Sequence, residues 1–420
     1  MSGVYGLAVD LGTTTLAVSL IDTGNGRRLA MTGGMNPQRR FGADVVTRLD
    51  AAVRSQAQLT EMSRLVRDEL WDLAGQVSGT TGIPLSEVRQ IAIAGNPAMQ
   101  HILLELPVTS LAFPPYRPRY TAGTGTSAAA LGWESDAGVY LFPMPGGFVG
   151  GDTVAFLYGR GGELLSGNTI LYLDMGTNGE MVLQTGDGLW ATAAAAGPAF
   201  EGGNLACGMA ALPGAVSSVR FVDDRVQLRV IGGVSPTGLC GSAAFEAVAE
   251  LLRCDIVEPG GRLRDSAEIP SNLAARVICH GGENVFVLYR DARTMVFLGQ
   301  GDIRQIQLAK SAIRAGMEVL AHAARTGLEH LDAVVLTGSF GAVLQPGWLK
   351  SIGIFDEGMI HMSRFTPEGV LAGAEAALAA GDRFVSAEAL AARIRVIPLS
   401  GTPLFEELFL RHIDFPRCLP

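Results

Sequence analysis

One short motif that combines a carboxylate, a glycine and a threonine occurs twice in this 420-residue chain. The first copy lies in YGLAVDLGTTT, at Tyr5 to Thr15, and the second in LYLDMGTNG, at Leu171 to Gly179. Each copy is an apolar run followed by an Asp, one apolar residue and a Gly-Thr turn. This pattern predicts a buried strand that enters a tight hairpin. The residues of the two motifs are Asp10, Gly12, Thr13, Thr14, Thr15, Asp174, Gly176, Thr177 and Asn178.

These turns contain the groups that bind phosphate. A glycine lets the backbone approach an anion because it has no Cβ, and backbone N–H groups and Thr hydroxyls donate hydrogen bonds to phosphate oxygens. Asp10 and Asp174 would supply oxygen ligands for Mg²⁺ through water. A single turn of this kind is more often an ordinary hairpin. Two copies in the same strand–turn–strand context instead favour two hairpins that hold one triphosphate from both sides.

The composition limits the classes of function. Hydrophobic residues make up 48% of the chain, which is enough for a large core, and the net charge of −9 argues against general nucleic-acid binding. The apolar runs are too short to predict a membrane span. The five cysteines are irregularly spaced without a CxxC pair, so neither a disulfide framework nor an iron–sulfur cluster is expected in this chain. We therefore expect a cytoplasmic protein without a membrane or nucleic-acid partner.

The predicted elements divide the chain into two similar halves. Residues 1–167 are expected to form a first lobe that opens with three strands over residues 4–35 and continues with two helices. Residues 168–420 are expected to form a second lobe that again opens with three strands and contains a long helix over 302–328. The Pro- and Gly-rich segment 106–132 predicts a long surface excursion. This order predicts an α/β fold whose ligand lies at the carboxyl ends of strands, in a cleft between two halves.

Several motifs resemble those of the actin, sugar-kinase and heat-shock-chaperone ATPase superfamily. DLGTTT and DMGTNGE are similar to its two phosphate motifs, and VVLTGSFG is similar to its adenosine motif. GNPAMQHILL and GVLAGAEAAL resemble its two connecting segments. The resemblance extends over essentially the whole chain. It implies a duplicated actin-like (ribonuclease H-like) two-lobed ATPase fold with a central nucleotide cleft, in which residues 367–380 return to the first lobe.

Within this superfamily, the chain resembles most the ATPase region of the reductive activators of corrinoid proteins. The strings that carry this resemblance are GNPAMQH, FVGGDTVA, DMGTNGE, GPAFEGG, PTGLCGS and GQGDIRQIQLAKSAI. It implies an ATPase that uses ATP and Mg²⁺ to help return a Co(II) corrinoid protein to Co(I). The implied partners are that corrinoid protein and an external low-potential electron donor such as a ferredoxin. The chain departs from the family pattern in having no iron–sulfur ligands and in carrying Ala243 where another glycine is expected.

The resemblance also assigns roles to individual residues. Asp10 and Asp174 would hold the Mg²⁺ and its water, and Asp152 would orient the water that attacks ATP. The alternative role of Asp152 is a helix cap. Glu201, Gln307 and Lys310 are candidates for ribose or adenine contacts, with surface polar residues as the alternative. The candidate adenosine-site residues in the VVLTGSFG motif are Gly338, Ser339 and Gly341.

Other residues have an ordinary and a functional interpretation. His101 is expected to be a buried histidine with satisfied hydrogen bonds rather than a catalytic one. Cys207 and Cys240 are expected to be buried free thiols rather than ligands of a cluster shared by two subunits. Arg117 and Arg119 belong either to a partner surface or to a solvated loop. Glu180 either faces the metal or ends a turn.

Two further functions stay open from the sequence. The chain could be a small-molecule kinase of the same superfamily, in which case it would need a pocket for a second substrate. It could also be an assembly or chaperone-like module that uses nucleotide as a switch. A homodimer through the Ala-rich C-terminal part also stays open.

Overall fold

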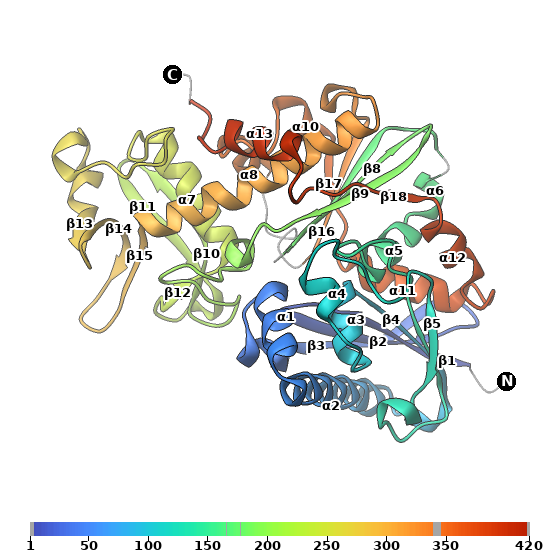
Figure 1. The fold of residues 1–420 in the computed structure, drawn as a ribbon. Coiled ribbons are helices and arrows are strands. Elements are labelled where there is room, and N and C mark those ends of the chain that lie inside the picture. Colours follow the sequence, from blue (N-terminus) through green and yellow to red (C-terminus); the bar gives the residue numbers. More distant parts are fainter. Residues whose placement is uncertain (1–3, 165, 177, 339–345, 418–420) are drawn as a thin grey trace. The chain divides into compact units, whose positions relative to one another are not determined.

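The computed structural model describes residues 4–164, 166–176, 178–338 and 346–417. Its contacts group the chain into two compact units (Figure 1). Unit 1 consists of Met1–Asn168, Gln184–Thr192 and Glu368–Ile397. Unit 2 consists of Thr169–Leu183, Ala193–Pro367 and Pro398–Pro420. Each unit therefore combines segments that are far apart in the sequence.

Unit 1 is built on a six-stranded sheet with the order β3-β2-β1-β4-β6-β5. β1, β2 and β3 form an antiparallel meander, as the sequence predicted, whereas β4 runs parallel to β1 and β6 runs parallel to β4. The central strand β1 is apolar and buried over most of its length, which is typical of a strand covered on both faces. The strands are β1 (Tyr5–Leu11), β2 (Thr15–Asp22), β3 (Arg27–Met35), β4 (Val88–Gly95), β5 (Thr124–Ser127) and β6 (Gly138–Leu141).

Helices cover both faces of this sheet (Figure 1). Leu7, Val9 and Leu11 of β1 share one core with the buried face of α2 (Gln56–Thr81). Successive strand residues point to opposite faces, and Gly6 accordingly lies against Leu378 of α11 (Gly369–Ala379). α11 therefore packs on the first sheet although it follows β1 by more than 350 residues. The other helices of unit 1 are α1 (Val45–Arg54), α3 (Pro97–Leu103), α4 (Thr109–Ala112), α5 (Gly151–Tyr158), α6 (Gly161–Leu164) and α12 (Val385–Ala391).

The Pro- and Gly-rich segment 106–132 is more than the surface excursion that its composition predicted. β5 pairs antiparallel with β6 and forms the edge of the first sheet. Leu111, Ala128 and Leu131 are buried in the core of unit 1. The prediction was wrong here because the strand is only four residues long and carries no β-branched apolar run, so pairing with β6 decides its conformation.

The second six-stranded sheet has the order β17-β16-β7-β8-β9-β18. The order β9-β8-β7-β16-β17 in this sheet corresponds to the order β3-β2-β1-β4-β6 in the first sheet. The strand β16 also runs parallel to β7, as β4 runs parallel to β1. The duplication that the two motifs predicted is therefore present in the sheet topology. Its strands are β7 (Ile170–Met175), β8 (Gly179–Thr185), β9 (Gly188–Ala194), β16 (Ala333–Thr337), β17 (Ser363–Phe365) and β18 (Ile394–Val396).

The longest helix of unit 2 is α8 (Gln300–Ala323), which the sequence predicted over 302–328. Asp302 caps its start by accepting a hydrogen bond from the Gly299 N–H at 2.9 Å. α8 packs against α13 (Pro403–Arg411). The shorter helices of unit 2 are α9 (Pro346–Ser351) and α10 (Glu357–Met362).

A subdomain lies between β9 and α8 in the sequence of unit 2. It contains the three-stranded sheet β11-β10-β12, the apolar helix α7 (Gly241–Arg253) and the three-stranded sheet β13-β14-β15. The last of these sheets was not predicted. The strands are β10 (Ala215–Val222), β11 (Arg225–Val230), β12 (Gly238–Leu239), β13 (Val277–His280), β14 (Glu283–Arg290) and β15 (Met295–Gly299).

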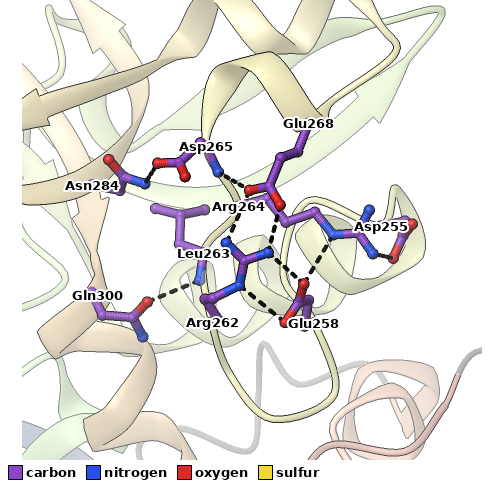
Figure 2. Close-up of polar contacts among 9 residues, drawn as sticks. All are labelled: Asp255, Glu258, Arg262, Leu263, Arg264, Asp265, Glu268, Asn284 and Gln300. Carbon is purple, nitrogen blue, oxygen red and sulfur yellow. Dashed lines mark hydrogen bonds and ion pairs between the residues drawn. The ribbon is translucent and has the colours of Figure 1, made fainter.

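Charged and polar side chains hold the connection between α7 and β13 (Figure 2). The Arg262 guanidinium donates to Glu258 at 2.6 Å and to Glu268 at 2.8 Å. Gln300, the first residue of α8, accepts a hydrogen bond from the Leu263 N–H at 2.9 Å. Exposed ion pairs stabilise a fold only weakly one at a time. Together with the Gln300 contact, they fix this segment to the start of α8.

No helix within the described residues is both long enough and apolar enough to span a bilayer.

Candidate functional site

The first predicted hairpin joins β1 to β2. Asp10 is the penultimate residue of β1, where it is paired with Ala94 of β4 and Ala17 of β2. A Cβ at Gly12 would overlap the carbonyl oxygen of Thr15, so a larger residue does not fit this turn. The glycine is therefore required by the close approach of two backbone segments inside the turn.

Three buried side chains hold this turn from the protein side. Asn36 Nδ2 donates to the Gly12 carbonyl at 2.9 Å, and the Arg48 guanidinium donates to the Thr13 carbonyl at 2.7 Å. Asn96 Nδ2 donates to the Thr13 hydroxyl at 2.9 Å. In a trans peptide, the N–H points away from the C=O of the same unit. The amides of Thr13 and Thr14 therefore point away from Asn36 and Arg48, which is the orientation needed to bind an anion.

The sequence did not identify these three holding residues as part of the site. Asn96 had a visible signal, because an Asn before Pro97 at a helix start is typical of an N-cap, and its Oδ1 does accept from the Met99 N–H at 3.0 Å. For Arg48 and Asn36, the sequence contains no such signal. Both are fully buried at 0% exposure, and only the folded structure brings them to the turn.

Asp152 lies in the first turn of α5, and the loop that leads into this helix rests on the β4–α3 connection. A Cβ at Gly150 would come within 2.6 Å of the Asn96 Cα, so the loop directly contacts the residue that holds Thr13. Asp152 Oδ1 accepts a hydrogen bond from the Thr153 N–H at 2.7 Å. Burial of the carboxyl raises the pKa of Asp152 to about 6. A carboxyl with this pKa can accept a proton near neutral pH.

The second hairpin joins β7 to β8, and Asp174 has the same position in it as Asp10 has in the first. It is the penultimate residue of β7 and is paired with Thr337 at the end of β16. Gly338 follows with a φ of +97°, a conformation that strongly favours glycine. A Cβ at Gly338 would come within 2.5 Å of Asp174 Oδ1. The structure therefore brings the first glycine of the predicted adenosine motif to the predicted metal ligand.

The loop after β9 also approaches the second hairpin. Glu201 ends a short 3-10 helix (Pro198–Glu201), and its Oε1 lies 3.4 Å from the position of a Cβ on Gly176. Gly176 donates its N–H to the Asn178 carbonyl at 3.1 Å, which closes the turn. Thr177, Ser339 and Gly341 lie outside the described residues. Their predicted contacts with nucleotide stay predictions.

Gln307 and Lys310 on α8 are buried, at 0% and 1% exposure, so the alternative of surface polar residues was wrong. Gln307 Nε2 donates to the Ile413 carbonyl at 3.1 Å. The Lys310 ammonium donates to the carbonyls of His412 and Asp414. Burial lowers the pKa of Lys310 to about 8. Both side chains thus hold the C-terminal segment on α8, and their role in binding nucleotide stays a prediction.

The remaining polar candidates have ordinary partners. His101 is buried, with one ring nitrogen 2.7 Å from the Pro97 carbonyl and the other accepting from the Arg119 N–H at 3.0 Å, as predicted. The Cys240 thiol is buried, as predicted, and donates to the Val216 carbonyl. Cys207 is half-buried rather than buried, and its sulfur accepts from the Phe297 N–H. Within the described part of the chain, no three His, Cys, Asp or Glu side chains are grouped as a metal site.

Known protein families match almost the whole length of the chain. The family described as the C-terminal domain of RACo, the ASKHA domain, matches residues 168–418, and the family described as the RACo middle region matches residues 5–161. The sheet topology and these matches together confirm the predicted duplicated, actin-like α/β fold.

Two relatives and one solved structure are similar over most of the chain. The corrinoid activation enzyme RamQ of Eubacterium limosum is 28% identical over 98% of the chain and 70% of that protein. The [Co(II) methylated amine-specific corrinoid protein] reductase of Methanosarcina barkeri is 23% identical over 86% of the chain and 69% of that protein. A solved reductive activator for corrinoid, iron–sulfur protein has a TM-score of 0.87 at 29% identity. The match covers 99% of this chain and 66% of that activator.

Proposed function

The chain belongs to the family of the C-terminal domain of RACo, the ASKHA domain, and from this premise we propose that it is an ATP-hydrolysing activator of a corrinoid protein. In this role it promotes the reduction of an inactive Co(II) corrinoid protein to Co(I). The observation that carries the ATPase part is the repeated Asp-bearing hairpin at the ends of β1 and β7. The names of the two relatives support the corrinoid part.

The donor groups of the two hairpins fit ATP with Mg²⁺. Asp10 and Asp174 carry hard carboxylate oxygens at equivalent strand ends, and such oxygens are the ligands that Mg²⁺ takes in phosphate sites. When bound, Mg²⁺ offsets the charge of the phosphate oxygens. The proposed phosphate contacts are the turn residues Gly12, Thr13, Thr14, Thr15, Gly176, Thr177 and Asn178.

We propose that Asp152 accepts a proton from the water molecule that attacks ATP. A water molecule attacks the γ-phosphate, the bond from phosphorus to the bridging oxygen of ADP breaks, and Asp152 takes the proton of the water. The raised pKa of Asp152 supports this role, because a stronger base accepts the proton more readily. Gly338, whose backbone lies against Asp174, is proposed to contact the nucleoside together with Ser339 and Gly341.

The reduction of Co(II) to Co(I) consumes one electron per cobalt. We propose that an iron–sulfur domain or protein such as a ferredoxin supplies it, and that ATP hydrolysis by this chain remodels the corrinoid protein so that the electron transfer becomes favourable.

The test is steady-state ATP hydrolysis with Mg²⁺, with and without a methylated-amine-specific corrinoid protein in its Co(II) form. We expect the corrinoid protein to stimulate hydrolysis and Asp174→Ala to abolish it in both conditions. Formation of Co(I), followed by its absorbance in the presence of a reduced ferredoxin, should require ATP. Hydrolysis that no Co(II) corrinoid protein stimulates, together with phosphorylation of a sugar or acid, would instead identify a small-molecule kinase.

A further inference from the structure

A group of aromatic and arginine side chains, exposed except for the half-buried Tyr116, lies on the surface of unit 1 near the segment that leads to Asp152. We name it the aromatic–arginine surface, and it consists of Phe113, Tyr116, Arg117, Arg119 and Phe148. Phe113 is 56% exposed and Phe148 is 38% exposed. The rings of Tyr116 and Phe148 lie in contact, with centroids 5.0 Å apart, although the two residues come from different loops. The surface is therefore one continuous feature.

The two arginines of this surface are exposed cations without a local counterion. Neither Arg117 nor Arg119 forms an ion pair with any residue that the structure describes. Other arginines of unit 1 do form ion pairs, as Arg28 does with Glu375 and Arg64 does with Asp68. Arginine and aromatic side chains are enriched in the core of protein interfaces and among the residues that contribute most to binding. Unpaired guanidinium groups beside exposed rings are complementary to a protein face that carries carboxylates.

The backbone of this surface is in direct contact with the segment that leads to Asp152. A Cβ at Gly147 would overlap the Tyr116 carbonyl oxygen, so the two loops pack backbone against backbone. Three residues later, Gly150 rests on Asn96 in the same way. Tyr116 itself has a φ of +52°, a left-handed conformation that is unfavourable for a non-glycine residue and that the surrounding contacts maintain.

The helix α3 provides a second connection, which links the aromatic–arginine surface to the first hairpin. The Arg119 N–H donates to His101 at the end of α3, and Asn96 at the start of the same helix donates to Thr13 of the first hairpin. His101 also stacks on Tyr120, with ring centroids 5.7 Å apart. A displacement of the surface loop would thus act on the two parts of unit 1 to which we assign hydrolysis.

We propose that the aromatic–arginine surface docks an acidic face of a partner protein, and that docking stimulates ATP hydrolysis through the 147–152 segment and α3. This inference rests on the proposed function, in which the partner is the Co(II) corrinoid protein. The rings contribute apolar contact area and the two guanidinium groups contribute charge complementarity.

The experiment compares the wild type with a double charge reversal, Arg117→Glu/Arg119→Glu. Its matched control is Arg225→Glu/Arg229→Glu on β11, which reverses two exposed arginines that form no ion pair with any described residue. The probe is a methylated-amine-specific corrinoid protein in its Co(II) form. We expect the surface variant to bind it about tenfold or more weakly, with a flatter dependence on salt. Its hydrolysis without the probe should equal that of the wild type.

A second variant, Phe113→Ser/Phe148→Ser, separates apolar contact from charge. It should weaken binding while leaving the salt dependence of binding unchanged. Equal stimulation of the wild type and of both surface variants would overturn the docking inference and leave the proposed function intact. A wild type that hydrolyses ATP without any stimulation by the probe would overturn both. Self-association of the wild type that Arg117→Glu/Arg119→Glu abolishes, with unchanged binding of the probe, would identify a second copy of the chain as the occupant.

Discussion

Asp152 is a carboxyl whose protonation should control the rate of hydrolysis. Burial raises its pKa to about 6, so the group is protonated, and unable to accept a proton, below that pH. We predict that ATP turnover at saturating Mg·ATP rises with pH and reaches half of its maximum near pH 6. Asp152→Asn should lower turnover about 10²- to 10⁴-fold.

The control for Asp152→Asn is the binding of a fluorescent ATP analogue, which should stay within a factor of about three because the change removes no proposed phosphate contact. Residual turnover in the variant should lack the acidic limb near pH 6. An unchanged pH profile in Asp152→Asn would assign the titration to another group.

Lys310 carries a buried ammonium whose charge the fold disfavours. Its pKa is lowered to about 8 in the folded state, whereas an unfolded lysine titrates near its ordinary value of about 10.4. Between these two pH values the unfolded chain binds more protons than the folded one, so stability rises with pH. We predict that the free energy of unfolding of the wild type, relative to Lys310→Met, increases by on the order of 2–3 kcal/mol from pH 8 to pH 10.5. Urea unfolding at each pH measures it.

The chain's other lysine provides the control, because Lys350 is exposed and paired with Glu357. Lys350→Met should show no comparable change over this pH range. If the stability difference from the wild type changed equally with pH in Lys310→Met and Lys350→Met, the pH dependence could not be assigned to the buried ammonium of Lys310.

At the scale of elements, α1 holds the first hairpin through the side chain of Arg48. Arg48 of α1 donates to the Thr13 carbonyl at 2.7 Å and to the Gly42 carbonyl at 3.0 Å. We predict that Arg48→Met raises the KM for ATP about tenfold. It should also lower the free energy of unfolding by about 1–3 kcal/mol, because two carbonyls lose their donor.

The matched control is Arg54→Met at the end of the same helix, where the side chain is 76% exposed and forms an ion pair with Asp50. That change should alter neither the KM nor, by more than about 0.5 kcal/mol, the stability. A normal KM in a destabilised Arg48→Met would show that the hairpin keeps its geometry without this contact.

At the scale of the whole molecule, we propose that both Asp-bearing hairpins act in the hydrolysis of Mg·ATP. We predict that Asp10→Ala and Asp174→Ala each lower ATP turnover about 100-fold or more, and that the double variant is no slower than the slower single variant. Residues that act on one ligand show such non-additive effects. Turnover by the double variant equal to the product of the two single effects would indicate two independent sites. Circular dichroism of each variant checks that the fold is retained.

The sequence by itself determined the duplicated architecture. Two Asp-x-Gly-Thr turns in the same strand context predicted a duplication, which the repeated sheet order confirms, and the apolar runs before Asp10 and Asp174 matched β1 and β7 closely. Local patterns sufficed there because a buried strand and a tight turn are encoded by consecutive residues.

The tertiary structure decided the contacts between distant segments. Arg48, Asn36 and Asn96 meet at one turn only after three elements pack together. Lys310 and Gln307 turned inward because the C-terminal segment offers them carbonyl acceptors, which periodicity along α8 cannot reveal. β5 formed from a Pro- and Gly-rich segment because β6 offered an edge. In each case the partner lies far away in the sequence, and the free energy comes from burial and hydrogen bonds that no local pattern specifies.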